Sequence, residues 1–251
     1  MAYSLKRCAS RLAPAALVAA AILVRPPAIA AAEDIPVDLE LVLAVDISAS
    51  IDRDEIGLQH AGYVAALRNP EVVAAMLGGV LGRVAITYVE WSDFRRTLVG
   101  WTLIDSADAA TAFAASVTAR PALRGETTVI DAAIDYAASL FDGNGFAGTR
   151  RFIDISSDGR DTYDPLDEKV PAARDRALAR GITINGLAIN PDREFIVVEG
   201  APEPLDRYFH ENIVGGPGAF VVVAETPSDF PRAVLRKLIR EIAAVAPPPR
   251  G

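Results

Sequence analysis

Apolar runs and amphipathic segments alternate along the chain, and this alternation predicts an α/β fold. Leu41–Val45 is a continuous apolar run, which is typical of a strand buried on both faces inside a parallel sheet. The segment 52–68 has apolar residues at helical spacing on one face and therefore predicts a helix. Further strands are predicted at 83–91, 94–104, 151–157, 182–189 and 219–224, and further helices at 70–77, 107–119, 128–141, 171–180 and from 226 onward.

The order of these elements predicts a three-layer, doubly wound sheet. Strands separated by helices run parallel, and the helices cover both faces of the sheet. The strand at 94–104 is the exception, because only two residues separate it from the strand before it. Such a short connection makes a hairpin. We therefore expect a mostly parallel, Rossmann-type sheet with one antiparallel strand at its edge.

Residues 1–32 have the pattern of a signal peptide. Three basic residues within the first eleven precede an apolar segment, Leu12–Val24, and small residues follow at 28–32. A retained membrane anchor is the alternative, but a membrane span needs about 20 apolar residues and this segment is shorter. We expect cleavage near residue 32, one domain over residues 33–246, and a disordered proline-rich tail over 247–251.

The exported chain would be strongly acidic and free of cysteine. Loss of residues 1–32 removes four basic and no acidic residues, so the formal charge changes from −8 to −12. The single cysteine, Cys8, is removed as well, which excludes disulfides, thiolate metal sites and a cysteine nucleophile. An acidic chain is a poor partner for nucleic acid or an anionic membrane surface. We expect a periplasmic or secreted bacterial protein with no membrane span after cleavage.

Oxygen-bearing side chains follow two predicted strands and precede one predicted helix. They are Asp46, Ser48 and Ser50 after the first apolar run, Thr127 before the helix at 128–141, and Asp158 after the strand at 151–157. Ligand sites in parallel sheets lie beyond the carboxyl ends of the strands. An all-oxygen set suits Mg²⁺, Mn²⁺ or Ca²⁺ rather than zinc or copper. With few carboxylates, the ion would keep positive charge and attract an acidic side chain from a partner.

These residues resemble the metal-ion-dependent adhesion site of von Willebrand factor type A domains. The matching positions are Asp46-x-Ser48-x-Ser50, Thr127 and Asp158. The resemblance spans roughly residues 37–245 and implies that Ser48, Ser50 and Thr127 contact the metal ion directly or nearly so. It implies that the two aspartates often act through water.

More narrowly, the chain resembles the DUF1194 group of exported bacterial proteins. The stretches that carry this resemblance are Tyr88–Ser92, Asn212–Phe220 and the closing helix Asp229–Ile242. No established activity of that group can be carried over to this chain, so the resemblance defines the fold more sharply than the function.

Simpler interpretations exist for several of these residues. Ser50 can cap the following helix instead of binding metal, and Thr128 can replace Thr127 as the ligand. Asp161 and Asp164 are interpreted as solvated loop acids.

Other polar and aromatic residues are weighed in the same way. His60 is interpreted as a satisfied, semi-buried histidine. The two histidines, His60 and His210, are far apart in the chain and no Gly-x-Ser-x-Gly motif is present, so a nucleophile–base pair is a weak hypothesis. Trp91 and Ser92 at a strand end, with Arg160 beside Asp158, are expected to form a rim that contacts the partner.

The leading hypothesis is a non-catalytic binding module whose divalent cation binds a carboxylate on a protein partner. A Mg²⁺-dependent phosphohydrolase with Asp46 as nucleophile is the alternative. Such enzymes usually place a second aspartate two residues later, where this chain has Ser48, and they need a lysine near the phosphate. A third hypothesis is an assembly factor that uses the same fold without filling a metal site.

Overall fold

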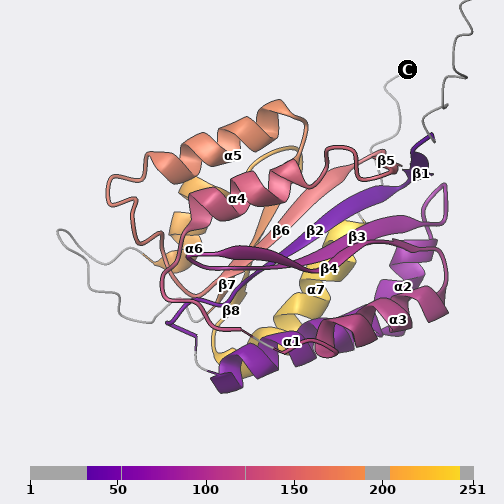
Figure 1. Cartoon of the computed structure of the whole chain (residues 1–251), viewed down its shortest axis with the longest axis horizontal. Helices are drawn as coiled ribbons and strands as arrows, with labels where there is room; N and C mark the ends of the chain where they lie inside the picture. The colour runs from indigo at the N-terminus through magenta and orange to yellow at the C-terminus, as the bar shows by residue number, and fades with distance from the viewer. Residues whose placement is uncertain (1–32, 52, 122, 190–203, 244–251) are drawn as a thin grey trace, which may run out of the picture. The chain divides into compact units, whose positions relative to one another are not determined.

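The computed structural model describes residues 33–51, 53–121, 123–189 and 204–243, and within them the apolar runs form a six-stranded sheet. The strand order is β4-β3-β2-β6-β7-β8 (Figure 1). The strands are β2 (Leu39–Asp46), β3 (Val84–Trp91), β4 (Arg95–Ile104), β6 (Arg151–Ser157), β7 (Thr183–Ile189) and β8 (Val221–Ala224). All neighbours pair in parallel except β3 and β4, so the predicted antiparallel edge strand is confirmed.

Helices cover both faces of this sheet, as the order of elements predicted (Figure 1). On one face lie α1 (Arg53–Leu67), α2 (Pro70–Leu77), α3 (Ala107–Thr118) and α7 (Phe230–Ala243). On the other lie α4 (Ile130–Ser139), α5 (Lys169–Ala179) and α6 (Leu205–Tyr208). Within the described residues, no helix is both long and apolar enough to cross a membrane.

The central strand β2 explains why the first apolar run has no polar alternation. All eight of its residues are buried. Leu41 and Leu43 pack into the core beneath α1, α2, α3 and α7, whereas Val42 and Ala44 pack into the core beneath α4, α5 and α6. A strand with a hydrophobic core on each side has no polar face.

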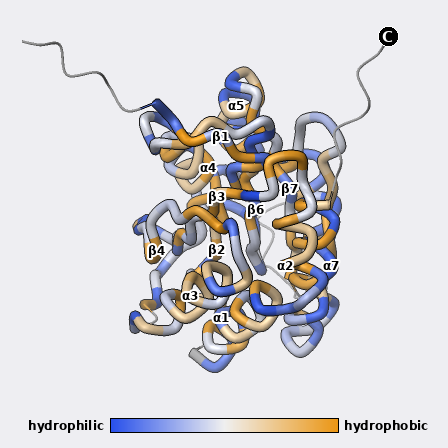
Figure 2. Tube along the Cα trace, turned by 90° about the vertical axis from the view of Figure 1, so that its right-hand side faces the viewer, coloured by the Kyte–Doolittle hydropathy of each residue, from blue (hydrophilic) through white to orange (hydrophobic). Residues whose placement is uncertain are grey.

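Unlike β2, the helices contain both hydrophilic and hydrophobic residues, as Figure 2 shows for α7. Phe230, Val234, Leu238 and Ile242 of α7 are buried in the core. This is the face that the sequence spacing predicted. The amphipathic pattern follows because each helix meets the sheet on one side and water on the other.

Several short elements were not predicted. A two-stranded parallel sheet joins β1 (Ile35–Val37) to β5 (Phe146–Gly148). The α6 helix continues into a π-helical turn, Phe209–Ile213, and a 3₁₀ turn, Pro227–Asp229, precedes α7. Elements of three to five residues are too short to produce a readable hydrophobic period.

The interpretation of Asp161 and Asp164 as solvated acids is wrong, because both side chains are buried. Asp161 accepts a hydrogen bond of 2.6 Å from the first backbone N–H of α4, at Ile130. Asp164 accepts three backbone hydrogen bonds at the start of α5. The first backbone N–H groups of a helix lack partners within the helix, and here two carboxylates of the loop between β6 and α5 accept their hydrogen bonds.

A cluster of charged side chains lies inside the core between α7 and the sheet. Lys237 is fully buried, and its ammonium nitrogen lies 2.6 Å from a carboxylate oxygen of Asp154 on β6 and 2.6 Å from one of Glu241. Burial, together with the negative charge of Asp154, raises the pKa of Glu241 to about 8. The sequence pattern predicted only the apolar face of this helix.

Candidate metal centre

Asp46, the last residue of β2, is fully buried and held by two hydrogen bonds. The backbone N–H of Ser48 donates to its Oδ1 at 2.7 Å, and the hydroxyl of Ser157 on β6 donates to its Oδ2 at 2.5 Å. The parallel pairing of β2 and β6 places their carboxyl ends at the same edge of the sheet. Asp46 is therefore fixed by both of these strand ends.

The hydroxyls of Ser48 and Ser50 connect this aspartate to Asp158. The two serine Oγ atoms lie 3.0 Å apart, and the Ser50 hydroxyl donates to Asp158 Oδ1 at 2.5 Å. Ser48 and Asp158 are buried, whereas Ser50 is half-buried. The structure thus brings together four of the five residues that the sequence pattern singled out, from the loops after β2 and β6.

The fifth residue, Thr127, differs from its neighbour Thr128 in its hydrogen bonding. The Thr128 hydroxyl donates to Ser48 Oγ at 3.1 Å. The hydroxyl oxygen of Thr127 is buried and has no hydrogen-bond partner among the described residues. Buried hydroxyls without a partner are rare, and each calls for an explanation such as a bound ion or water. The donor set therefore fits a metal ion, and the Thr127 oxygen, unlike that of Thr128, has no competing hydrogen bond among the described residues.

The loop that carries Thr127 is held against the ends of β2 and β3. The N–H of Gly125 donates to the carbonyl of Ile47 at 2.7 Å, and the N–H of Glu126 donates to Asp93 Oδ1 at 2.8 Å. This last hydrogen bond is the main reason why the pKa of Asp93 lies below its ordinary value. A Cβ atom on Gly125 would lie 2.2 Å from Ser92 Cβ, so only glycine permits this approach.

Arg124 fixes the same loop to the loop after β2. Its Nε donates to the carbonyl of Ile51 at 3.0 Å, and its Nη2 donates to the carbonyl of Ala49 at 2.5 Å. Sequence reasoning missed both Arg124 and Asp93 as positioning residues. Asp93 lies two residues beyond the end of β3, and its position near a strand end, like that of Asp46, was a usable signal. Arg124 has no comparable signal in the sequence.

The two site aspartates make this edge of the sheet electrostatically unfavourable without a cation. Burial, and secondly the charge of Asp158, raise the pKa of Asp46 from 3.8 to about 7, although hydrogen bonds from Ser157 and Ser48 oppose the shift. In the part of the chain that the structure describes, no group of three or more His, Cys, Asp or Glu side chains is arranged for metal binding. A cation at this edge would have two carboxylates and several hydroxyl oxygens near it, and an all-oxygen environment suits a hard cation.

Two of the three residues expected at the rim are not available to a partner. Trp91 is fully buried and packs in the core beneath α4, α5 and α6, and Ser92 is fully buried next to Gly125. Because β3 lies inside the sheet, between β4 and β2, the side chains at its end are covered. Arg160 is half-buried, donates to Asp167 at 2.6 Å and lies over the ring of Tyr208.

His60 has a hydrogen-bond partner, as predicted. Its Nε2 lies 2.8 Å from Glu90 Oε1, and the other carboxylate oxygen of Glu90 accepts a hydrogen bond from Arg96 at 2.7 Å. His60 and Glu90 are both buried.

A mostly parallel sheet with one antiparallel edge strand, flanked by helices on both faces, is a fold that this chain shares with a von Willebrand factor type A protein. Residues 36–246 match the family described as "Protein of unknown function (DUF1194)". The chain therefore belongs to the DUF1194 family. No curated protein matches it in sequence.

Solved structures with the same fold come from several sources. Proximal thread matrix protein 1 from the mussel byssus, solved with a zinc-occupied MIDAS motif, matches with a TM-score of 0.57 and 14% identity over 84% of this chain and 50% of its own. The pilus adhesin SpaC from Lactobacillus rhamnosus GG matches at 0.60 and 15%, over 84% and 31%.

A von Willebrand factor type A protein from Catenulispora acidiphila matches at a TM-score of 0.55 and 16% identity, over 82% of this chain and 42% of its own. The present chain spans half or less of the length of these three proteins. At such low identities the likeness establishes the fold.

Proposed function

We propose that this protein is a non-catalytic binding module that uses a divalent cation to bind an acidic side chain of a protein partner. The observation that carries the proposal is the unpartnered buried hydroxyl of Thr127 in the loop next to two buried carboxylates. The zinc-occupied MIDAS motif of the mussel matrix protein, on the same fold, supports it.

The chain's own residues would divide the work of holding Mg²⁺, Mn²⁺ or Ca²⁺. Ser48, Ser50 and Thr127 would offer hydroxyl oxygens, and Asp46 and Asp158 would supply the negative charge. The ion would supply an electrophilic position for an outside oxygen, because Mg²⁺ in particular rarely obtains all its ligands from one protein. A carboxylate from a partner fits that position by charge and by ligand type.

The alternative, a phosphohydrolase with Asp46 as nucleophile, has less support. Asp46 is fully buried, and both of its oxygens accept hydrogen bonds. Ser48 stands where a catalytic acid would be needed. Among the described residues, Lys169 donates to a backbone carbonyl at the start of α5, and Lys237 is buried in its ion cluster. Neither is arranged to bind a phosphate at Asp46.

The proposed location is the periplasm or the cell exterior. Its support is the sequence of residues 1–32, which lie outside the described residues, and the acidic, cysteine-free composition of the remainder. A pilus adhesin with the same fold is consistent with a role outside the cytoplasm. A protein partner, rather than nucleic acid, fits the net charge.

Calorimetric titration tests the metal site. Mg²⁺ and Mn²⁺ are titrated into chelator-stripped protein from residue 33 onward, which forms a compact unit. We expect about one ion bound per chain, and loss of that binding in Asp46→Ala. Absence of binding at millimolar ion would contradict the proposal. A screen of phosphate esters serves as the second arm, because metal-dependent turnover that disappears in Asp46→Asn would favour the enzyme.

A further inference from the structure

The last helix, α7, carries only positive charge on its exposed surface. Its charged residues are Arg232, Arg236, Lys237, Arg240 and Glu241, and of these Lys237 and Glu241 are buried in the core. The three arginines are exposed and follow one another at intervals of four residues. Side chains four residues apart lie on the same side of a helix, about 6 Å apart along its axis. We call this row of three residues the arginine stripe.

The arginine stripe contrasts with the charge of the rest of the chain. Residues 33–251 contain 21 basic and 33 acidic residues, so their formal charge is −12. On α5, the exposed Arg176 is paired with a carboxylate, because its guanidinium lies 2.6 Å from Asp135. The guanidinium groups of Arg236 and Arg240 have no carboxylate partner among the described residues. They are unpaired cations in an acidic protein.

The guanidinium of Arg240 is held in place although it has no ion pair. Its central carbon lies 3.8 Å from the centre of the ring of Phe220, the residue directly before the edge strand β8. A guanidinium stacked on a ring uses its face, and its N–H donors, which lie in its plane, remain available for a carboxylate. Because the side chain is already ordered, it loses less entropy when it binds an anion.

Apolar side chains lie beside the arginine stripe. Leu235 and Ile239 directly precede Arg236 and Arg240, and both are half-buried against the core. The outer side of α7 therefore combines hydrocarbon with guanidinium groups. A second helix packed along α7 would cover the hydrocarbon. Acidic residues four positions apart on that helix would have the same spacing as the arginines.

The acidic remainder of the chain restricts which anion can bind here. Nucleic acid and anionic membranes are extended, so they would also face the acidic surface around the arginine stripe. Interactions between exposed charges are largely screened beyond about 8 Å at physiological ionic strength. A short acidic segment can therefore be attracted by the stripe without strong repulsion from the more distant carboxylates.

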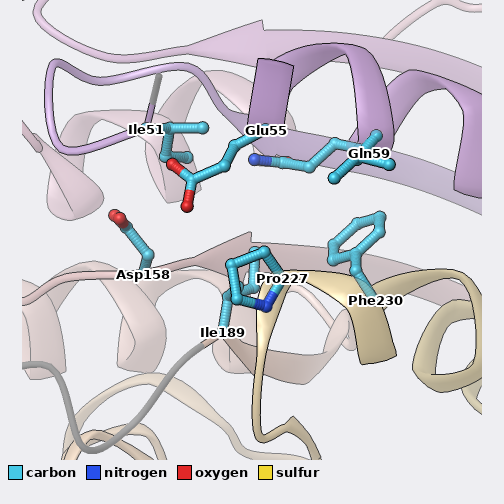
Figure 3. Close-up of a pocket in the computed structure, with 8 residues that line it drawn as sticks. Ile51, Glu55, Gln59, Asp158, Ile189, Pro227 and Phe230 are labelled. Atoms are coloured by element: carbon cyan, nitrogen blue, oxygen red, sulfur yellow. The ribbon is translucent and has the colours of Figure 1, made fainter. Parts of the chain in front are cut away.

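The arginine stripe runs away from the candidate metal centre. Pro227 and Phe230, at the start of α7, line a small pocket together with Asp158 (Figure 3). Arg240 comes ten residues after Phe230, which is about 15 Å further along the helix axis. A ligand at the far end of the stripe therefore needs no contact with the metal centre.

We propose that the arginine stripe binds an acidic helix of a protein partner, whose carboxylates, four residues apart, face Arg236 and Arg240. The inference goes beyond the metal-dependent binding proposed above and does not depend on it. It assigns to α7 a second attachment that requires no metal ion and is weakened by salt.

Peptide titration in chelator tests the inference, because chelator removes any metal ion that could bind the peptide at the other site. The probe is a capped, alanine-rich helical peptide with glutamate at every fourth position, and the control peptide has glutamine at those positions. Binding is followed by NMR through the Nε–H signals of Arg236 and Arg240.

We expect saturable shifts with the glutamate peptide and an affinity at least about fivefold weaker for the glutamine peptide. Most of this difference should disappear at about 1 M salt, where the screening length is about 3 Å. Equal affinities for the two peptides, or no saturable shift up to several millimolar glutamate peptide, would overturn the inference.

Three variants locate the effect. Arg236→Gln and Arg240→Gln should each weaken binding of the glutamate peptide by about threefold. Arg120→Gln is the matched control, because Arg120 is an exposed arginine just after α3, which packs on β4 at the opposite edge of the sheet from β8. It should change the affinity by less than about twofold. An equal loss in the control would mean that net charge, and not the stripe, attracts the peptide.

Vesicles that contain phosphatidylglycerol test the competing occupant. We expect no co-sedimentation of the protein with these vesicles at physiological salt. Co-sedimentation that disappears in the double variant Arg236→Gln/Arg240→Gln would assign the stripe to an anionic membrane surface and overturn the proposal of a protein helix.

Discussion

The substitution Asp46→Asn should stabilise the metal-free protein while it abolishes metal binding. Asparagine has the shape of aspartate and can still accept the hydrogen bond from the Ser48 N–H, so the local geometry is preserved. It removes a charge that is fully buried and close enough to Asp158 for repulsion. Without a cation, that charge weakens the folded state.

The pKa of Asp46 sets the size of this effect. Its pKa rises from 3.8 to about 7 on folding. The folded protein therefore binds a proton that the unfolded chain has released between these pH values, and the associated stability is lost as the pH rises through 7. At pH 8 the buried charge costs about 4 kcal/mol, from 1.36 kcal/mol per pKa unit. The advantage of the asparagine variant should shrink by about 3 kcal/mol between pH 8 and pH 5.

Urea unfolding in chelator at pH 5 and pH 8 measures these differences, and Asp54→Asn serves as the matched control because Asp54 is exposed. Glu241 also has a raised pKa, about 8, and changes the stability of both proteins in the same direction. Only the difference between variant and unaltered protein therefore reports on Asp46. Addition of Mg²⁺ at pH 8 should stabilise the unaltered protein and leave Asp46→Asn unchanged.

Three results would contradict this reasoning. A variant less stable than the unaltered protein at pH 8 in chelator would mean that the carboxylate is not a buried, repelled charge. An advantage that did not change between pH 8 and pH 5 would mean that Asp46 does not take up a proton in that range. Equal stabilisation of both proteins by Mg²⁺ would show that the ion binds at another site.

Three further predictions concern the surroundings of the site and the core. Thr127→Val should lower Mg²⁺ affinity by about tenfold, or ~1.4 kcal/mol, without loss of stability. Thr128→Val should instead lower the free energy of unfolding by about 1 kcal/mol, because it breaks a hydrogen bond. Calorimetry and urea unfolding would show the reverse if Thr128 were the ligand. Gly125→Ala should displace the loop, because the new Cβ overlaps Ser92. We expect a loss of ~1–3 kcal/mol in stability and loss of metal binding. An unchanged Mg²⁺ titration would contradict this. Lys237→Met should cost ~3–5 kcal/mol, because the buried groups of Asp154 and Glu241 lose their cationic partner. Thermal unfolding within a degree of the unaltered protein would show that the buried ammonium contributes no net stability.

The linear sequence was sufficient to predict the sheet and the strand ends. Continuous apolar runs require a core on each side, and the alternation of runs with amphipathic segments leaves few topologies open. The short connection before β4 likewise specified the antiparallel edge. Since ligand loops follow the carboxyl ends of parallel strands, Asp46 and Asp158 were recognisable as neighbours although 112 positions separate them in the printed sequence.

Other properties were decided by the tertiary structure, because they depend on which groups meet across long distances in the chain. The hydroxyls of Thr127 and Thr128 are adjacent in the sequence but differ in the structure: that of Thr128 contacts Ser48, whereas that of Thr127 has no hydrogen-bond partner among the described residues. Trp91 lies at a strand end, where an aromatic side chain could contact a partner, yet it is buried in the core.

The partners of Asp161 and Lys237 were likewise decided by the tertiary structure. Asp161 caps a helix that begins 31 residues before it, and Lys237 finds its carboxylate partner Asp154 on β6. Hydrophobic periodicity reports whether a position faces the core or water. It does not report which polar group lies opposite, and that pairing determines whether a buried oxygen is satisfied, repelled or left available to a metal ion.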